Sequence, residues 1–368
     1  MACYKEFSPF WISGFTGIVL RNSWCYFNMA RMKKAVTRSR LPKSSPVKVR
    51  RQPSESFPVV GIGASAGGLE AVTLLLKDLP QDTGMAFVLV QHLDPLHESS
   101  LTTLLSRATA MLVSEAREGM VVEPDHVYVI PPNKSMFIEQ RVLHLLPRSK
   151  GGEIHAPVDY FFRSLAADRG GEAIGIVLSG TGKDGTLGME EIKAAGGITF
   201  VQNEATAKYG GMPSSAGGSG SADYILPPQE IAKELTRISL HPHLGPARAV
   251  ETATVVPADG EEFKLICTLL RNHSGVDFFH YKPATLRRRI SRRMVLQKLE
   301  TLREYAVFLR SSPSEVEALF QDILICVTGF FRDAKVFDLL KKKKIFPKLL
   351  KSRQNDAPIR LWVAGCST

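Results

Sequence analysis

The stretch that most constrains the fold of this chain runs from Pro58 to Gly68 and reads P-V-V-G-I-G-A-S-A-G-G. The apolar residues from Val59 to Ile62 predict a short buried strand, and the glycines around them permit a tight turn. Apolar residues then recur at helical spacing from Leu69 to Lys77, which predicts a helix. The sequence therefore predicts a strand, a turn and a helix in succession, with Ser65 at the tip of the turn.

Three interpretations of this turn are open from its residues alone. Gly61, Gly63 and the pair Gly67 and Gly68 approximate a dinucleotide-binding loop, in which glycine lets a pyrophosphate approach the helix N-terminus. The segment from Gly63 to Gly67 also reads G-x-S-x-G, the pattern that lifts a nucleophilic serine above a sheet edge. The plainest interpretation is a serine that caps its own helix.

Strand and helix patterns alternate after Phe57, which is typical of a doubly wound, mostly parallel sheet with helices on both faces. Two shorter runs predict a hairpin inserted into this sheet. The predicted strands are 59–62, 86–90, 127–130, 173–178, 198–201 and 224–226, the helices are 69–77, 99–106, 158–168, 186–195 and 228–236, and the hairpin runs are 136–139 and 141–145.

Three chemically useful residues follow predicted strands, where parallel sheets collect their catalytic groups. Ser65 follows the first strand, His92 the second, and Asp184 comes after I-G-I-V-L. A serine, an imidazole and a carboxylate are what a hydrolytic triad requires. Taken singly, His92 could be a surface turn residue and Asp184 a helix cap. The dinucleotide interpretation weakens here, because the second strand ends in Gln91 and His92 instead of an acidic residue.

Charge and cysteine content narrow the class of protein. The 368 residues carry a net charge of +11, and residues 1–55 alone hold eleven Lys and Arg against two Glu. This leader is expected to be a disordered, solvated basic tail, so nucleic acid is not an expected partner. Five cysteines without C-x-x-C pairing, and scattered histidines, predict no metal site and a reducing, cytoplasmic location. The apolar run 10–20 is too short for membrane insertion.

Four motifs together resemble one family. G-I-G-A-S-A-G-G, Q-H-L-D-P, S-G-T-G-K-D-G and E-A-T-A-K-Y-G-G-M-P, within residues 56–238, look like the catalytic domain of the chemotaxis protein-glutamate methylesterase (CheB). The resemblance implies that Ser65 is the nucleophile, His92 its base and Asp184 the orienting partner, with no cofactor. It further implies that the substrates are glutamyl γ-methyl esters on the cytoplasmic helices of methyl-accepting chemoreceptors, with glutamine deamidation as a side activity.

Other parts of the expected esterase site follow from the same stretches. The backbone N–H of Ala66, beside the nucleophile at a helix N-terminus, is the expected oxyanion donor. Met212 and Pro213 are expected to line the rim of the site. No receiver domain is recognised in the leader, so a separate receiver or histidine kinase protein is the partner expected for control.

The second half reads as a linker over 239–260 and a small helical domain over 261–345. Its expected helices are 261–270, 283–299, 301–310, 314–324 and 334–340. One helix carries a basic cluster, expected either to be a solvated face or to dock an acidic receptor helix. The cluster consists of Arg287, Arg288, Arg292 and Arg293.

Motifs of this half resemble a second family. F-F-H-Y-K-P-A-T-L-R-R-R-I-S-R-R, V-T-G-F-F-R-D and the final R-L-W-V-A-G-C-S-T look like the chemoreceptor methyltransferase (CheR). The resemblance implies that Thr328, Arg332 and Gly365 belong to an S-adenosylmethionine site. Residues 346–368 are expected to begin the first strand of a truncated, Rossmann-like methyltransferase domain. Cofactor would then bind only to an intact domain, so no methyl transfer is expected from this chain.

Two functions from different classes follow. The first is a serine hydrolase that removes glutamyl methyl esters and is fused to an incomplete methyltransferase. The second is an inactive scaffold that binds a receptor or signalling helix without turnover. Methanol release separates the two.

Overall fold

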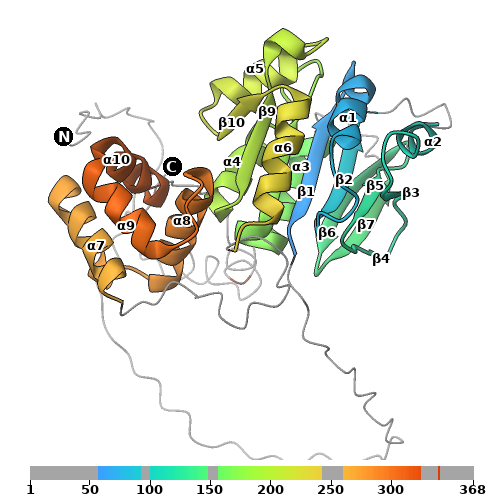
Figure 1. Ribbon diagram of the computed structural model, residues 1–368. Coiled ribbons are helices and arrows are strands. Elements are labelled where there is room, and N and C mark those ends of the chain that lie inside the picture. Colours follow the sequence, from blue (N-terminus) through green and yellow to red (C-terminus); the bar gives the residue numbers. More distant parts are fainter. Residues whose placement is uncertain (1–56, 93–99, 148–155, 243–259, 325–338, 340–368) are drawn as a thin grey trace, which may run out of the picture. The chain divides into compact units, whose positions relative to one another are not determined.

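The computed structural model describes residues 57–92, 100–147, 156–242, 260–324 and Leu339 (Figure 1). Apart from Leu339, these residues fall in one compact unit, Arg51–Val327. The expected leader, the helix 334–340 except for Leu339, and the strand expected near the C-terminus lie outside the described residues. Below, residues 57–242 are called the α/β part and residues 260–324 the helical part.

A seven-stranded parallel sheet forms the centre of the α/β part, in the order β10-β9-β8-β1-β2-β5-β3. The central strand β1 pairs with β2 and β8 on its two sides, and all six of its residues are buried. Its strands are β1 (Val59–Ala64), β2 (Ala86–Gln91), β3 (Leu112–Glu115), β5 (His126–Val129), β8 (Ala173–Val177), β9 (Ile198–Gln202) and β10 (Tyr224–Leu226). The predicted doubly wound parallel sheet is confirmed.

Helices cover both faces of this sheet (Figure 1). Alternate residues of β1 and its neighbours belong to two separate apolar clusters, because successive side chains of a strand point to opposite faces. One cluster joins the sheet to α1 (Gly68–Lys77), α2 (Leu101–Leu105) and α6 (Pro228–Ser239). The other joins it to α3 (Pro157–Arg169), α4 (Thr186–Ala195) and α5 (Gly211–Gly218).

The predicted hairpin forms, but it belongs to a sheet of its own. Strands β4 (Met120–Val121), β6 (Lys134–Glu139) and β7 (Val142–Pro147) pair antiparallel in the order β4-β7-β6. The hairpin lies against α3, where the N–H of Ile138 donates to Oγ of Ser164 at 3.0 Å. The small sheet therefore packs on the same side of the main sheet as α3.

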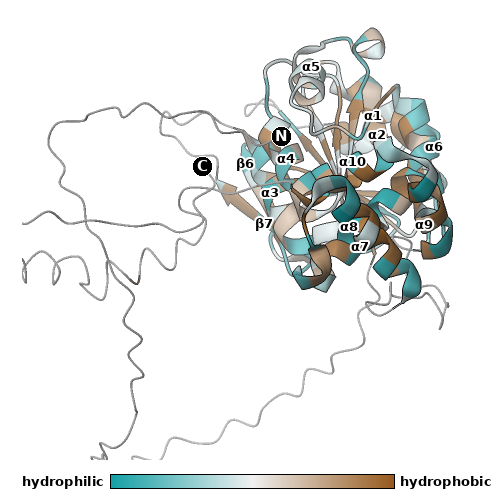
Figure 2. Cartoon of the chain, turned by 90° about the vertical axis from the view of Figure 1, so that its left-hand side faces the viewer, coloured by the Kyte–Doolittle hydropathy of each residue, from teal (hydrophilic) through white to brown (hydrophobic). Residues whose placement is uncertain are grey.

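Four helices make up the helical part, namely α7 (Glu261–Ser274), α8 (Pro283–Leu296), α9 (Leu302–Ser311) and α10 (Pro313–Ile323). They enclose an apolar cluster, and Figure 2 shows hydrophilic and hydrophobic stretches alternating along them, as amphipathic helices require. The capping box of this part involves Thr301 and Glu304 at the start of α9.

Close packing of α3 over β1 leads to a prediction at Gly63. A Cβ built there would lie 2.3 Å from Cγ1 of Val158, which is fully buried. We expect Gly63→Ala to lower the free energy of unfolding by about 1–3 kcal/mol, because overpacking forces the helix outward. Urea denaturation measures this. Gly218→Ala, whose Cβ meets nothing within 4 Å, should be neutral or slightly stabilising; equal effects of the two changes would contradict the packing argument.

Candidate active site

The turn that carries Ser65 is held by its own backbone and by the neighbouring strand. The N–H of Ser65 donates to the carbonyl of Ser179 at 3.0 Å, and that of Gly68 donates to the carbonyl of Ser65 at 2.9 Å. Gly67 has a left-handed φ of 71°, and a Cβ there would lie 2.7 Å from Oγ of Ser179. Only glycine fits this position without strain, so the turn presents Ser65 in one orientation.

The structure brings Ser65, His92 and Asp184 together at the carboxyl edge of the sheet. Nδ1 of His92 lies 3.2 Å from Oγ of Ser65, and Nε2 lies 2.9 Å from Oδ2 of Asp184. The residues come from the ends of β1 and β2 and from the loop between β8 and α4. A carboxylate only accepts hydrogen bonds, so Nε2–H donates to Asp184 and Nδ1 can accept from the Ser65 hydroxyl.

Asp184 is fixed by the first turn of α3 as well as by His92. Its Oδ2 accepts from the N–H of Val158 at 3.0 Å, and its Oδ1 accepts from the N–H of Asp159 at 2.9 Å. The side chain is 8% exposed. A carboxylate is stabilised at a helix N-terminus, where N–H groups lack partners within the helix. The sequence did not reveal this support, because α3 begins 27 residues upstream of Asp184 in the chain.

A second carboxyl group, Asp159, lies directly beside this arrangement. It accepts from the N–H of Gly188 at 2.7 Å and so connects α3 to the first turn of α4. Burial raises the pKa of Asp159, and the charge of Asp184 raises it further, against the lowering effect of the Gly188 hydrogen bond. Sequence reasoning missed Asp159, which looks like an ordinary acidic residue in the first turn of a helix.

Ser179 forms hydrogen bonds to the turn that carries Ser65, to the loop at Tyr209 and to Gln202 at the end of β9. Its Oγ donates to the carbonyl of Ala66 at 2.9 Å and accepts from the N–H of Tyr209 at 3.0 Å. Its backbone N–H donates to Oε1 of Gln202, which is buried, at 2.8 Å. The only sequence signal for this role was its place at the end of a strand, next to Gly180. Ser179 therefore positions the turn that carries Ser65.

Ala66 occupies the position expected of an oxyanion donor. It lies between Ser65 and Gly67, at the entry to α1. Among the described residues, no acceptor is hydrogen-bonded to its N–H. Such an N–H is suited to meet a developing negative charge next to the nucleophile.

Met212 and Pro213 do not form the exposed rim that the sequence predicted. Both are buried, and Met212 is 0% exposed. The N–H of Met212 donates to the carbonyl of Gly180 at 2.9 Å. A Cβ at Gly180 would lie 2.2 Å from the Met212 sulfur and 2.9 Å from Cβ of Ser65. Because α5 turns this residue inward, Met212 supports the site from inside the fold.

The four arginines expected to dock a receptor do not share one exposed face. The side chain of Arg292 is 1% exposed and forms ion pairs with two carboxylates of the chain. Nε of Arg293 donates to Oε1 of Glu315 at 2.8 Å. Arg287 is half-buried and Arg288 is exposed. The predicted docking face is therefore wrong for Arg292 and Arg293, because carboxylates within the chain already neutralise them.

Other predictions concern cofactors, metals and membranes. Thr328, Arg332 and Gly365 lie outside the described residues. Within the described ranges, no group of three or more His, Cys, Asp or Glu side chains is arranged to hold a metal ion. In the same ranges, no helix combines the length and apolar character needed to cross a bilayer.

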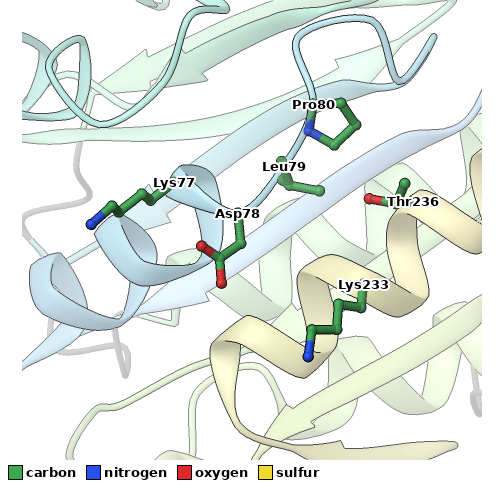
Figure 3. A pocket seen from close by; sticks show the side chains of 6 residues that line it. All are labelled: Lys77, Asp78, Leu79, Pro80, Lys233 and Thr236. Atoms are coloured by element: carbon green, nitrogen blue, oxygen red, sulfur yellow. The ribbon is translucent and has the colours of Figure 1, made fainter.

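A surface cleft of about 590 Å³ lies at the other end of α1 (Figure 3). It is lined by Lys77, Asp78, Leu79, Pro80, Lys233 and Thr236. Helix α1 starts beside Ser65 and ends at Lys77, so its length of about 15 Å separates the cleft from the triad. The cleft is not part of the arrangement around Ser65.

Two family models match the chain. Residues 60–235 match the model described as CheB methylesterase. The α/β part is a CheB methylesterase domain. Residues 261–324 match the CheR methyltransferase, all-alpha domain, so the helical part is of this second type. The resemblance to these two families stated from the sequence is confirmed.

The chain is also similar to curated proteins. The chain is 36% identical over 208 residues to "Protein-glutamate methylesterase/protein-glutamine glutaminase 2" of Burkholderia lata, covering 56% of this chain and 60% of that protein. It is 35% identical over 286 residues to an uncharacterized 104.1 kDa protein of Rhodobacter capsulatus, covering 73% of this chain and 30% of that one. The chain thus spans less than two thirds of these curated relatives.

A solved structure is also similar. It is the crystal structure of the Thermotoga maritima CheB methylesterase catalytic domain, with 31% sequence identity and a TM-score of 0.46. The match covers 49% of this chain and 98% of that one.

Proposed function

We propose that the methylesterase domain hydrolyses γ-methyl esters of glutamate side chains on the cytoplasmic helices of methyl-accepting chemoreceptors. The observation that carries the proposal is the chain of contacts from Oγ of Ser65 through the His92 ring to Asp184, at 3.2 and 2.9 Å. The name of the Burkholderia relative supports the substrate class, and adds glutamine side chains as a second substrate.

Acylation would begin when Nδ1 of His92 takes the proton of Ser65 and Oγ attacks the ester carbonyl. The carbonyl oxygen becomes an oxyanion. The N–H of Ala66 donates a hydrogen bond to it, and the positive end of α1 stabilises its charge. Asp184 stabilises the imidazolium that forms and keeps the proton on Nε2. When the carbon–oxygen bond to the methoxy group breaks, the Nδ1 proton goes to the leaving oxygen and methanol departs.

Deacylation would repeat the sequence with water as the nucleophile. His92 takes a proton from water, the hydroxide attacks the acyl-serine, and the proton returns to Oγ of Ser65. The products are a free glutamate side chain and the regenerated serine. With glutamine as substrate, the same steps release ammonia in place of methanol.

A fluorophosphonate probe tests whether Ser65 is activated by His92. We expect stoichiometric labelling at Ser65 in the wild-type chain, and labelling at least about 100-fold slower in His92→Ala, because general-base assistance typically contributes that much or more. Peptide mapping identifies the labelled residue and intact-protein mass spectrometry gives the rate.

His144→Ala is the matched control for this experiment. His144 lies in the separate hairpin and its Nδ1 is 2.8 Å from Oε1 of Glu118. Its removal should leave labelling unchanged. Labelling of another serine, or equal rates in wild type and His92→Ala, would contradict the proposed nucleophile and would favour an inactive receptor-binding scaffold.

A further inference from the structure

Three arginines of α8, namely Arg288, Arg289 and Arg292, contact the methylesterase domain, and Arg292 is the most deeply buried of them. Its Nη1 donates to Asp322 of α10 and its Nη2 donates to Asp223, which precedes β10 in the methylesterase domain. Its Nε donates to the carbonyl of Gly197 at 2.9 Å, just before β9. One guanidinium therefore connects a carboxylate of the helical domain to a carboxylate and a carbonyl of the methylesterase domain.

Asp223 is already held in place on the methylesterase side. Its Oδ2 accepts from the N–H and the Oγ1 of Thr199, at 3.0 and 2.9 Å. Its Oδ1 lies 3.7 Å from Nζ of Lys193 and faces Arg292, and the side chain is 5% exposed. A buried carboxylate of fixed orientation is costly to leave without a strong partner. The methylesterase domain thus presents an acceptor shaped for a guanidinium.

Arg289 makes a second connection one turn earlier in α8. Its Nη1 donates to the carbonyl of Lys193 at 2.7 Å and its Nη2 to that of Ala194 at 2.5 Å. Both carbonyls belong to the last turn of α4, which carries a partial negative charge, and that of Lys193 also accepts from the N–H of Gly196 at 3.0 Å. Arg289, which belongs to the helical domain, therefore caps the C-terminal end of α4 in the methylesterase domain.

The surface around α4 also fits α8 in shape. A Cβ at Gly196 would lie 2.8 Å from Cδ of Arg288, so any other residue there would force this side chain to shift. Val295 belongs to the apolar cluster that α1 and α6 form with the sheet. Nη2 of Arg237, near the end of α6, donates to the carbonyl of Val295 at 3.1 Å. Apolar, polar and charged contacts thus coincide along one side of α8.

All these contacts lie at the edge of the sheet opposite to Ser65. They involve the end of α4, the end of α6, and the residues just before β9 and β10, whereas the triad follows β1, β2 and β8. We propose that the partner of the arginine-rich helix α8 is the methylesterase domain of the same chain, with Arg289 and Arg292 forming a latch at the amino edge of its sheet. The contacts of α8 given above do not involve the catalytic edge, and these two arginines are not available to an acidic partner outside the chain.

The test uses the full chain with a protease recognition sequence placed within residues 246–252. After cleavage, we expect the two halves of the wild-type chain to co-elute in size-exclusion chromatography. Arg289→Met should weaken their association at least about thirty-fold, because removing one side of a buried charged hydrogen bond typically costs that much or more. Chromatography of the cleaved chain over a dilution series gives the dissociation constant without first separating the halves.

Two further variants complete the design. Arg310→Met removes an exposed arginine of α9 and should leave the dissociation constant unchanged. Arg292→Met should act like Arg289→Met, but it also removes the partner of Asp322 within the helical domain. Arg289 makes no such internal contact among the bonds described above, so its variant decides the result even if Arg292→Met unfolds. Halves that separate in the wild type, or equal affinities for Arg289→Met and Arg310→Met, would overturn the latch.

Discussion

Ser65→Ala should reduce methanol release from a methylated receptor fragment on the order of 10⁴- to 10⁶-fold, by analogy with other serine hydrolases that lose their nucleophile. The physical reason is that Ser65 supplies the hydroxyl next to the base, with its Oγ 3.2 Å from Nδ1 of His92. Ala66 N–H and the substrate-binding surface would remain, so a small rate above that of water should persist. Gas chromatography of released methanol measures both rates.

Ser214→Ala provides a matched control. Ser214 is an exposed serine of α5 whose Oγ donates to the carbonyl of Gly210 at 2.7 Å. Its loss should leave methanol release within about two-fold of wild type, since exposed substitutions have small effects. If Ser65→Ala kept a tenth or more of the wild-type rate, Ser65 would not be the nucleophile.

The rule that parallel strands end at one edge made most of this site predictable. Ser65, His92 and Asp184 each follow a strand with a strong apolar signal, so their meeting could be inferred without knowing any side-chain position. Within the main sheet, the strand that the sequence missed is β3, which lacks this signal. Leu112 is 61% exposed and the strand lies at the sheet edge, so burial imposes no clear pattern on it.

The supporting residues could not be predicted in the same way. Asp159 and Ser179 acquire their roles only because α3 and the loop at Tyr209 approach the site from distant parts of the chain. Met212 was misjudged for a related reason, since the sequence does not show which way α5 turns. Arg292 shows why the sequence does not reveal which basic side chains are buried. A basic helix looks solvated until the position of the neighbouring carboxylate is known.

Asp184→Asn should lower methanol release about 10⁴-fold, the effect seen when the orienting aspartate of a triad becomes an amide. An amide NH₂ facing Nε2 would favour the tautomer with the proton on Nδ1, which cannot accept from Ser65. The change should also lower the free energy of unfolding by about 1–3 kcal/mol, because the N–H groups of Val158 and Asp159 lose a charged acceptor. Methanol release and urea denaturation measure the two effects separately.

Asp168→Asn separates the catalytic effect from the structural one. Asp168, in α3, also accepts two backbone N–H bonds, from Gln140 at 2.5 Å and Arg141 at 3.3 Å, but these two residues belong to the turn of the β6–β7 hairpin. Its change should affect stability and leave methanol release intact. If both variants lost activity only in proportion to their loss of folded protein, Asp184 would be a structural cap of α3 and His92 would act without an orienting carboxylate.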